Sequence, residues 1–440
     1  MTTIACVVLA MATLQPSTAA GEDPARIVDL AECARLGLLN DPGLRIDELE
    51  SAAAAARVRE LQGQYVPSVT LQAGYARLSD VPAGSFGPFA LPASPLNSTI
   101  IKLSVQQPLF TGFRIAGSIR QAEAVRAATG SDAARTRREV RRAVEEAYWQ
   151  LARAKALAKA SREGEAQLER RLADVKTLFD QGVATSNDVL QAGMRLEDSR
   201  IDAGNAGSAR DLARVRLAQV IGVPLSPGID ITEDDPEAAA PAPVPMTPDA
   251  LAELISRALA ARSEVKSAHS RAISQDAAFE LAHAGRFPSV VLTGDYTLAN
   301  PNPRVFPQAD EFTGTWSVGL MASFDVGRYP QIAAQEEQAR TRAAQAREAV
   351  RRVSEGVAAE VVRAAIVLNA ALQSHASLKI ESAQAEENAR YVQERYRQGV
   401  ALPSAQLDAE TLLARARLRE QAGLYDCMIA RAGLDATVGE

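Results

Sequence analysis

The sequence has few of the residues that build catalytic or metal sites. Its 440 residues include three cysteines and three histidines. The cysteines are too few for a disulfide framework and lack the spacing of a metal site. No histidine has a second ligand beside it, and the sequence contains neither a Gly-rich phosphate loop nor a nucleophile elbow. We therefore expect no cofactor, no metal and no enzymatic activity.

Two of the cysteines, Cys33 and Cys427, belong to the expected mature chain. We interpret them as two inert thiols, since a free cysteine behaves as a small hydrophobic residue. A disulfide between them is the alternative in an oxidising compartment.

The chain also lacks an excess of positive charge. Its 48 basic and 54 acidic residues give a formal net charge of −6. The basic run Arg135 to Arg142 is interleaved with Glu139 and followed by Glu145 and Glu146 at helical spacing, which is typical of a solvated, salt-bridged helix face. Nucleic acid is therefore excluded as a partner.

Long hydrophobic runs are missing too, since none reaches the ~18 residues of a spanning helix. The longest run, Ile4 to Leu14, precedes small residues and indicates a signal peptide at residues 1–20. The basic residues usual at the start of such a leader are missing, which a start downstream of the true one would explain. Lipidation at Cys6 is a less favoured interpretation, because the apolar core follows the cysteine.

Four short segments show the period-two alternation of β-strands. After Pro67, the apolar residues Val69, Leu71, Ala73 and Tyr75 alternate with polar or small ones. Similar segments occupy residues 101–106, 290–297 and 316–324.

Helical periodicity dominates the rest. Residues 27–64 indicate two helices with a break near Pro42, and residues 249–286 indicate a helical segment. The proline-free residues 113–181 and 331–398 predict much longer helices, and at ~1.5 Å per residue the first would span roughly 100 Å. Helices of this length must pack lengthwise on others, as in a coiled coil.

A short turn follows each long helix. Gln181-Gly182-Val183 and Gln398-Gly399-Val400 lie 217 residues apart, since 399 − 182 = 217. Glycine can adopt the left-handed conformation that ends a helix, and the Ser, Thr or Asn that follows can cap the next one. Each turn is therefore predicted to be the tip of a helical hairpin, whose second arm reaches about residue 222 or 434.

The order helix, strand pair, long helix, tip and shorter helix thus occurs twice. We predict an α+β fold with an internal duplication: a first repeat at residues 21–222, an acidic, Pro-rich linker at 223–248 and a second repeat at 249–440.

The apolar face of the four strands has no obvious covering layer, because the helices are expected to pack on each other. If this face meets lipid, the sheet must close, since open edges are not tolerated in hydrocarbon. A membrane barrel needs ~8 strands or more, so several copies of the chain are required. Aromatic residues lie near strand ends or on the apolar faces, as at a membrane interface: Tyr75, Phe110, Tyr296, Trp316 and Phe324. A soluble sheet with buried aromatics is the alternative.

A series of short motifs runs through the chain in a fixed order. They are Tyr65-Val66-Pro67-Ser68-Val69 with its echo Arg286-Phe287-Pro288-Ser289-Val290, Val105-Gln106-Gln107-Pro108-Leu109-Phe110-Thr111-Gly112, Ala147-Tyr148-Trp149, Gln181-Gly182-Val183-Ala184, Asp188-Val189-Leu190-Gln191-Ala192 and Val220-Ile221-Gly222-Val223-Pro224. Each is weak alone, but in this order and in a duplicated frame the chain resembles the TolC-type outer-membrane efflux proteins (outer membrane factors) over nearly all of its mature length.

The resemblance implies a homotrimer whose twelve strands form an outer-membrane barrel and whose twelve helices form a periplasmic coiled-coil tunnel. It also implies two partners, an inner-membrane transporter and the periplasmic adaptor (membrane fusion) protein that connects it to the tunnel. The tips that meet the adaptor correspond to Gly182, Val183, Gly399 and Val400. The alternative is that these residues only make good turns.

The same resemblance points to a gate of acidic residues beside the second tip. Asp408 matches one acidic position, whereas the other falls on Ala405 and the basic link falls on Ala401. Asp188, the equivalent of Ala405 in the first repeat, is a weaker candidate. Three copies of Asp408 around an axis would favour cations, although a solvated helix carboxylate is the alternative.

The sequence therefore predicts a passive exit duct of a tripartite efflux or type I secretion system in the outer membrane, with its helices in the periplasm. The alternative is a periplasmic coiled-coil scaffold, or an adaptor-like binding protein, with a small soluble sheet.

Overall fold

The computed structural model describes residues 26–79, 85–86, 89–90, 96–224, 229–232, 241–306 and 309–439. The expected signal peptide and Cys6 lie outside these residues. The chain forms two compact units. The first takes its residues from Met1–Asn40, Ala143–Ala240 and His375–Ile429, and the second from Asp41–Arg142, Pro241–Ser374 and Ala430–Glu440.

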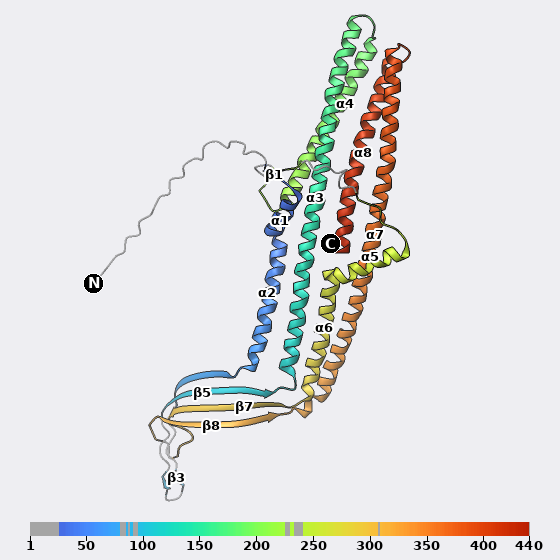
Figure 1. Ribbon diagram of the computed structural model, residues 1–440. Helices are drawn as coiled ribbons and strands as arrows, with labels where there is room; N and C mark the ends of the chain where they lie inside the picture. The colour runs from blue at the N-terminus through green and yellow to red at the C-terminus, as the bar shows by residue number, and fades with distance from the viewer. Residues whose placement is uncertain are drawn as a thin grey trace, which may run out of the picture. The chain divides into compact units, whose positions relative to one another are not determined.

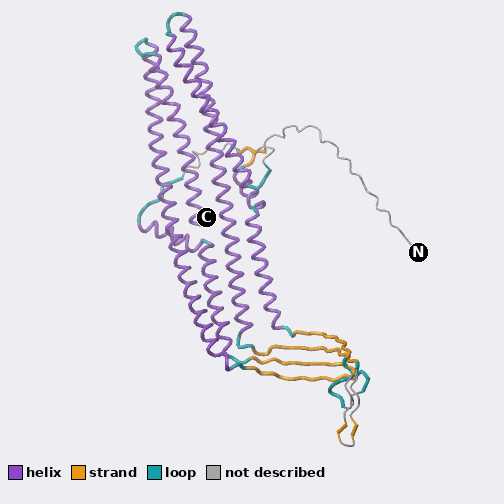
Figure 2. Tube along the Cα trace, turned by 180° about the vertical axis from the view of Figure 1, so that it is seen from behind, coloured by secondary structure: helices purple, strands orange, loops and turns teal. Residues whose placement is uncertain are grey.

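The second unit contains the four predicted strands in one antiparallel sheet (Figures 1 and 2). The strand order is β2 (Ser68–Arg77), β5 (Asn97–Phe110), β7 (Ser289–Asn300) and β8 (Thr313–Ser323). Strands from both halves of the sequence thus pair directly, β5 with β7. A further short hairpin, β3 (Ser85–Phe86) with β4 (Phe89–Ala90), falls in the sequence between β2 and β5.

The register places like residues in continuous rows across all four strands. Leu71, Leu103, Tyr296 and Trp316 form one row on the apolar face. The alternate residues form rows on the other face, such as Thr70, Ser104, Asp295 and Ser317. On this polar face Lys102 Nζ pairs with Asp295 Oδ1 at 3.0 Å. The alternation of apolar and polar residues predicted from the sequence is therefore confirmed, and the register aligns the apolar residues of neighbouring strands on one face.

A sharp turn joins β5 to α3 (Arg114–Asp180) in the second unit. Gly112 has a φ of +60°, and a Cβ there would lie 2.6 Å from the Ala284 carbonyl oxygen and 2.8 Å from Phe287 Cβ. Only glycine fits such a turn without displacing its neighbours. The edge-to-face ring contacts of Phe113 with Phe110 and Phe287 pack the same corner.

Two helix breaks precede the strand pairs. Between α1 (Leu30–Asn40) and α2 (Pro42–Gln62), Asp41 caps α2 by accepting a hydrogen bond from the Leu44 amide at 2.6 Å. The predicted helix at residues 249–286 is also interrupted, into α5 (Pro248–Ala261), α6 (Ser263–His283) and a short 3-10 turn (Ala284–Arg286). This second break, at Arg262, was not predicted because no proline or glycine marks it. Arg262 adopts an extended backbone there, and its guanidinium binds Glu264 and Glu360 at 2.8 and 2.9 Å.

The long helices match the predicted plan closely. α3 has 67 residues and α7 (Tyr329–Arg397) has 69, while α4 (Ser186–Val220) has 35 and α8 (Pro403–Val438) has 36. Such similar lengths confirm the internal duplication. Among the described residues, no helix is both long and apolar enough to cross a membrane.

The first unit contains both tips and a two-stranded parallel sheet that the sequence analysis missed. β1 (Arg26–Val28) pairs with β6 (Ile229–Ile231), which lies within the predicted linker. α4 ends nearby at a turn in which Gly222 has a φ of +67° and Asn40 Nδ2 donates to the Ile221 carbonyl at 3.0 Å. Tyr148, Leu151, Leu217, Ile221, Cys33 and Cys427 are fully buried, and both cysteines are free thiols.

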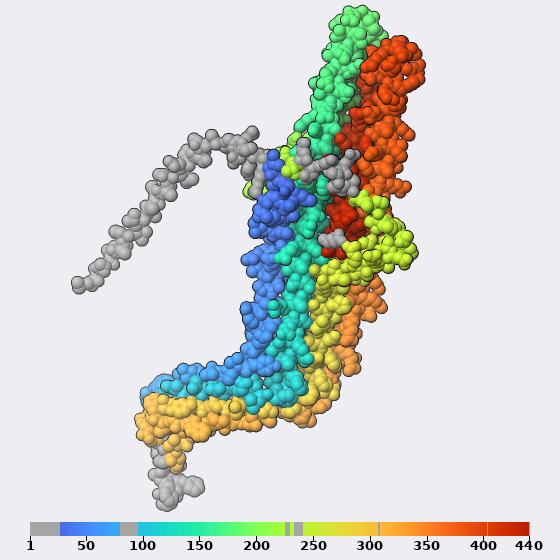
Figure 3. Space-filling view, viewed as in Figure 1, coloured from blue at the N-terminus to red at the C-terminus, as the bar shows by residue number. Residues whose placement is uncertain are grey.

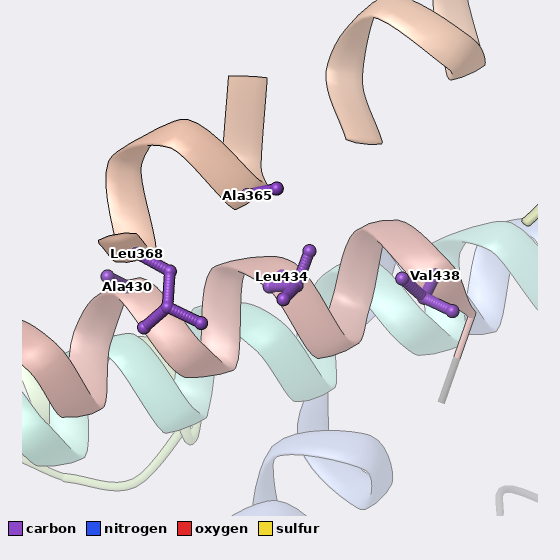
Figure 4. Packing of buried hydrophobic residues seen from close by; sticks show 5 residues of the cluster. All are labelled: Ala365, Leu368, Ala430, Leu434 and Val438. Carbon is purple, nitrogen blue, oxygen red and sulfur yellow. The ribbon is translucent and has the colours of Figure 1, made fainter. Parts of the chain in front are cut away.

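Apolar side chains between helices hold each unit together. Figure 4 shows one cluster of the second unit, in which Ala365 and Leu368 of α7 point toward Ala430, Leu434 and Val438 of α8. Small alanines in this cluster allow the two helices to approach closely.

Candidate functional site

The first tip closes α3 with a left-handed glycine. Gly182 has a φ of +75°. Its amide donates to the Phe179 carbonyl at 2.9 Å, and the Val183 amide donates to the Leu178 carbonyl at 2.9 Å. These two bonds satisfy carbonyl groups at the helix end that would otherwise have no partner. The sequence prediction of a glycine-terminated helix is confirmed here.

The second tip repeats this geometry. Gly399 also has a φ of +75°, its amide donates to the Tyr396 carbonyl at 2.9 Å, and the Val400 amide donates to the Arg395 carbonyl at 2.9 Å. Both tips lie at the same end of the first unit (Figures 1 and 3). The duplication is therefore preserved down to individual hydrogen bonds.

The tips present apolar side chains to solvent. Val183 is 73% exposed and Val400 is 61% exposed. A Cβ at Gly182 or Gly399 would meet no atom within 4 Å, so backbone conformation, not space, requires glycine there. The first tip thus presents one exposed valine, and the second presents Val400 together with Leu402, which is 72% exposed.

The two tips differ in how the next helix begins. In the first, Thr185 caps α4: its hydroxyl accepts from the Asp188 amide at 3.3 Å, and Asp188 Oδ2 accepts from the Thr185 amide at 2.8 Å. In the second, α8 begins at Pro403, so Ser404 lies inside its first turn and the expected Ser cap is absent.

Asp188, one of the two candidate gate residues, is therefore engaged in a helix cap. Its carboxylate also accepts from the Thr185 hydroxyl at 2.7 Å. These bonds from Thr185, the hydroxyl first and the amide second, lower the pKa of the Asp188 carboxyl below its ordinary value. A stable anion beside the N-terminus of α4 also suits the helix dipole.

Asp408, the other candidate, forms an ion pair that the sequence analysis missed. Arg195 of α4 donates to the Asp408 carboxylate and, through its second nitrogen, to the Thr411 hydroxyl at 3.1 Å. Asp408 and Thr411 are three residues apart and so lie on one face of α8. The pair links the first hairpin, α3–α4, to the second, α7–α8.

A second link between the hairpins lies on α3. Arg171 donates to the buried Gln406 side chain, and its guanidinium lies 5.5 Å from the centre of the Tyr396 ring. Gln406 in turn donates to Glu410 at 2.9 Å. No sequence signal identifies Arg195 or Arg171, because each finds its partner more than 200 residues away.

An apolar groove runs along the first hairpin near its tip. It has a volume of about 540 Å³ and is lined by the apolar residues Leu172, Val189, Leu190 and Met194. Lys176, Glu197 and Asp198 also line it. Such a surface suits an amphipathic helix that carries both apolar and charged side chains.

Comparison with protein families identifies the chain. The model of the outer membrane efflux protein family matches residues 35–223 and 254–440, and the chain belongs to this family. It is therefore an outer-membrane exit duct of an efflux system, with its helices in the periplasm. No match was found among curated proteins.

Solved structures share the fold. The outer-membrane channel OprN is 21% identical, with a TM-score of 0.73 over 95% of this chain and 93% of that one. A membrane protein from Pseudomonas aeruginosa is 21% identical, with a TM-score of 0.75 over 98% and 100%. CusC, a protein studied for transmembrane channel formation, is 16% identical, with a TM-score of 0.77 over 96% and 95%. At these identities the likeness establishes the fold.

Proposed function

We propose that three copies of this chain form the duct, so that twelve strands close a barrel in the outer membrane and the helices form a tunnel. The in-register apolar face of the sheet carries this proposal. Leu71, Tyr296 and Trp316 on that face are largely exposed in the single chain. Among the described strands, β2 and β8 each keep an unpaired edge in this sheet, which lipid does not tolerate. Pairing β8 of one copy with β2 of the next removes every edge.

Exposed apolar residues on the helices of the second unit also support assembly. Ile255 of α5 and Val362, Ile366 and Val367 of α7 line a shallow groove of about 540 Å³. Ile366 and Val367 are more than half exposed. A neighbouring copy that covers them would remove this area from water.

The mass of the native protein, extracted in mild detergent from isolated outer membranes, tests the assembly. A trimer that conducts ions in a planar bilayer is the expected result. A monomer in the soluble periplasmic fraction would contradict barrel closure and favour the scaffold alternative.

We infer further that the duct is passive and works with a periplasmic adaptor and an inner-membrane transporter. The two tips are the proposed adaptor contacts, because Gly182 and Gly399 carry no side chain while Val183 and Val400 are exposed beside them. The apolar groove on α3 and α4 adds a surface on which an adaptor helix can lie. Asp408, linked to Arg195, is the proposed gate residue, and the capped Asp188 contributes less.

Charged substitutions at the valines test the tip assignment. Val183→Asp combined with Val400→Asp should abolish export in the native host while the outer-membrane trimer still forms. Gln181→Asp is the matched control, since Gln181 is an exposed polar neighbour in the same turn. Bulky residues at Gly182 and Gly399 should give the same loss. Normal export by the valine variants would exclude the tips as the adaptor contact.

A further inference from the structure

A cavity of about 690 Å³ lies in the first unit, outside the tip residues. One wall is a single face of α3, because Tyr148, Ala152 and Ala156 follow at spacings of four residues, with Lys155 and Lys159 beside them. The alanines leave space that larger side chains would fill.

The other walls come from distant parts of the sequence. Arg210 and Arg214 reach the cavity from α4, Asp230 and Thr232 from the end of the β1–β6 sheet, and Tyr425 from α8. Strand β6 therefore pairs with β1 and also lines one side of this cavity.

The lining is strongly basic. The lining contains two acidic residues, Glu163 and Asp230, and five basic ones: Lys155, Lys159, Arg162, Arg210 and Arg214. Lys155 is neutralised, because its Nζ lies 3.1 Å from both Asp230 Oδ1 and the Ile231 carbonyl oxygen. Arg210 pairs with Asp211 at 2.7 Å.

Three cations of the lining have no such partner within the part of the chain that the structure describes. Among the described residues, neither Lys159, Arg162 nor Arg214 has a carboxylate within ion-pair distance. The Nε atom of Arg214 is also buried and has no hydrogen-bond acceptor in this part of the chain. A buried charged donor without an acceptor is costly and rare in folded proteins.

We propose that this cavity binds a small multivalent anion, a compound with phosphate or several carboxylate groups. Guanidinium groups bind the paired oxygens of such anions with two parallel hydrogen bonds. The cavity volume is in the usual range for small-ligand sites, about 300–1,000 Å³. The site lies within one chain and depends neither on the tips nor on an adaptor.

Calorimetric titration of the full-length detergent-purified protein with sodium pyrophosphate, at constant ionic strength, tests this site. One saturable binding event per chain is expected. Arg214→Gln should weaken it by at least about tenfold, because a hydrogen bond to a charged group is lost. Arg216→Gln is the matched control: it lies on the same helix outside the cavity, where its guanidinium donates to Gln219 at 3.4 Å.

Several results would overturn the proposal. They are no binding by the natural chain, equal weakening by Arg216→Gln, or unchanged binding by Arg214→Gln. If Arg214→Gln does not fold, Lys159→Gln replaces it, since Lys159 is exposed at the rim and should still weaken binding severalfold. The acidic residues Glu233, Asp234 and Asp235 directly follow Thr232 in sequence. Binding that appears only after these three are neutralised would also exclude the site in the natural chain.

Discussion

The ion pair between Arg195 and Asp408 gives the sharpest test of the proposed gate. It joins the two hairpins within one chain, beside the link from Arg171 to Gln406, so breaking it should weaken the contact between them. The side chains of Arg195 and Asp408 are 31% and 60% exposed, so water screens the attraction. A pair of this kind stabilises by about 0.2–1 kcal/mol.

The effect multiplies if the three proposed copies open together. Three links would then favour the closed state by about 0.6–3 kcal/mol. Since 1.4 kcal/mol is a tenfold change, the closed-to-open ratio would fall by about 3- to 140-fold when all three are lost. Single-channel recording in planar bilayers measures this ratio directly.

Four proteins complete the experiment: the natural chain, Arg195→Gln, Asp408→Asn and the double variant. Each single variant should raise the open probability, and the double variant should add little, because both substitutions remove the same link. Arg200→Gln is the control. Arg200 also lies on α4, but it pairs with Glu169 of α3 at 2.8 Å, inside one hairpin.

Ion selectivity adds a second readout. Asp408→Asn removes a negative charge and should reduce cation preference, whereas Arg195→Gln leaves Asp408 unbalanced and should increase it. An Arg195→Gln channel that gates like the natural one, or effects that simply add in the double variant, would refute the gate.

Three further predictions follow from local geometry. Gly182→Ala should lower the free energy of unfolding, measured by thermal melting, by about 1–2 kcal/mol, because alanine is strained in the left-handed conformation. Gly222→Ala should lower it further, because the new Cβ would also lie 2.6 Å from Asn40 Cβ. Thr185→Ala should cost about 1 kcal/mol at neutral pH through loss of the cap. The pKa of Asp188 is lowered in the folded state, so its carboxylate stabilises the fold at pH values above its unfolded pKa. This stabilisation is lost as the pH falls through the folded-state pKa. The difference in stability between the natural chain and Thr185→Ala should therefore shrink when melting is measured in acid. Burial raises the pKa of Cys33 to about 11, so a maleimide at neutral pH should leave this thiol unlabelled until the protein unfolds, and rapid labelling of the native protein would contradict the structure.

Features that depend on local sequence were predictable. The strand alternation around Leu71 and Trp316 follows from a period of two residues, and the tip at Gly182 follows from the conformational freedom of one residue. Both signals lie within a few residues of the structure they specify, and the duplication supplies an independent second copy of each.

Features that depend on distant partners were not predictable in the same way. β6 has three residues and forms only because it pairs with β1, about 200 positions earlier. The break at Arg262 has no local signal and is held by Glu264 and Glu360. Asp408 was identified from the resemblance, but its partner Arg195 was not, since the equivalent residue in the second repeat is Leu412.

The two repeats share the geometry of their turns but differ in what the acidic residue near each tip contacts. In the first repeat the acidic residue nearest the tip, Asp188, is engaged in the cap of α4. In the second, α8 begins at Pro403 without that cap, and Asp408 lies one turn deeper, where Arg195 of the other hairpin reaches it. The first repeat therefore has a capped tip, whereas the second places its acidic residue in contact with the other hairpin, the contact that we propose as the gate.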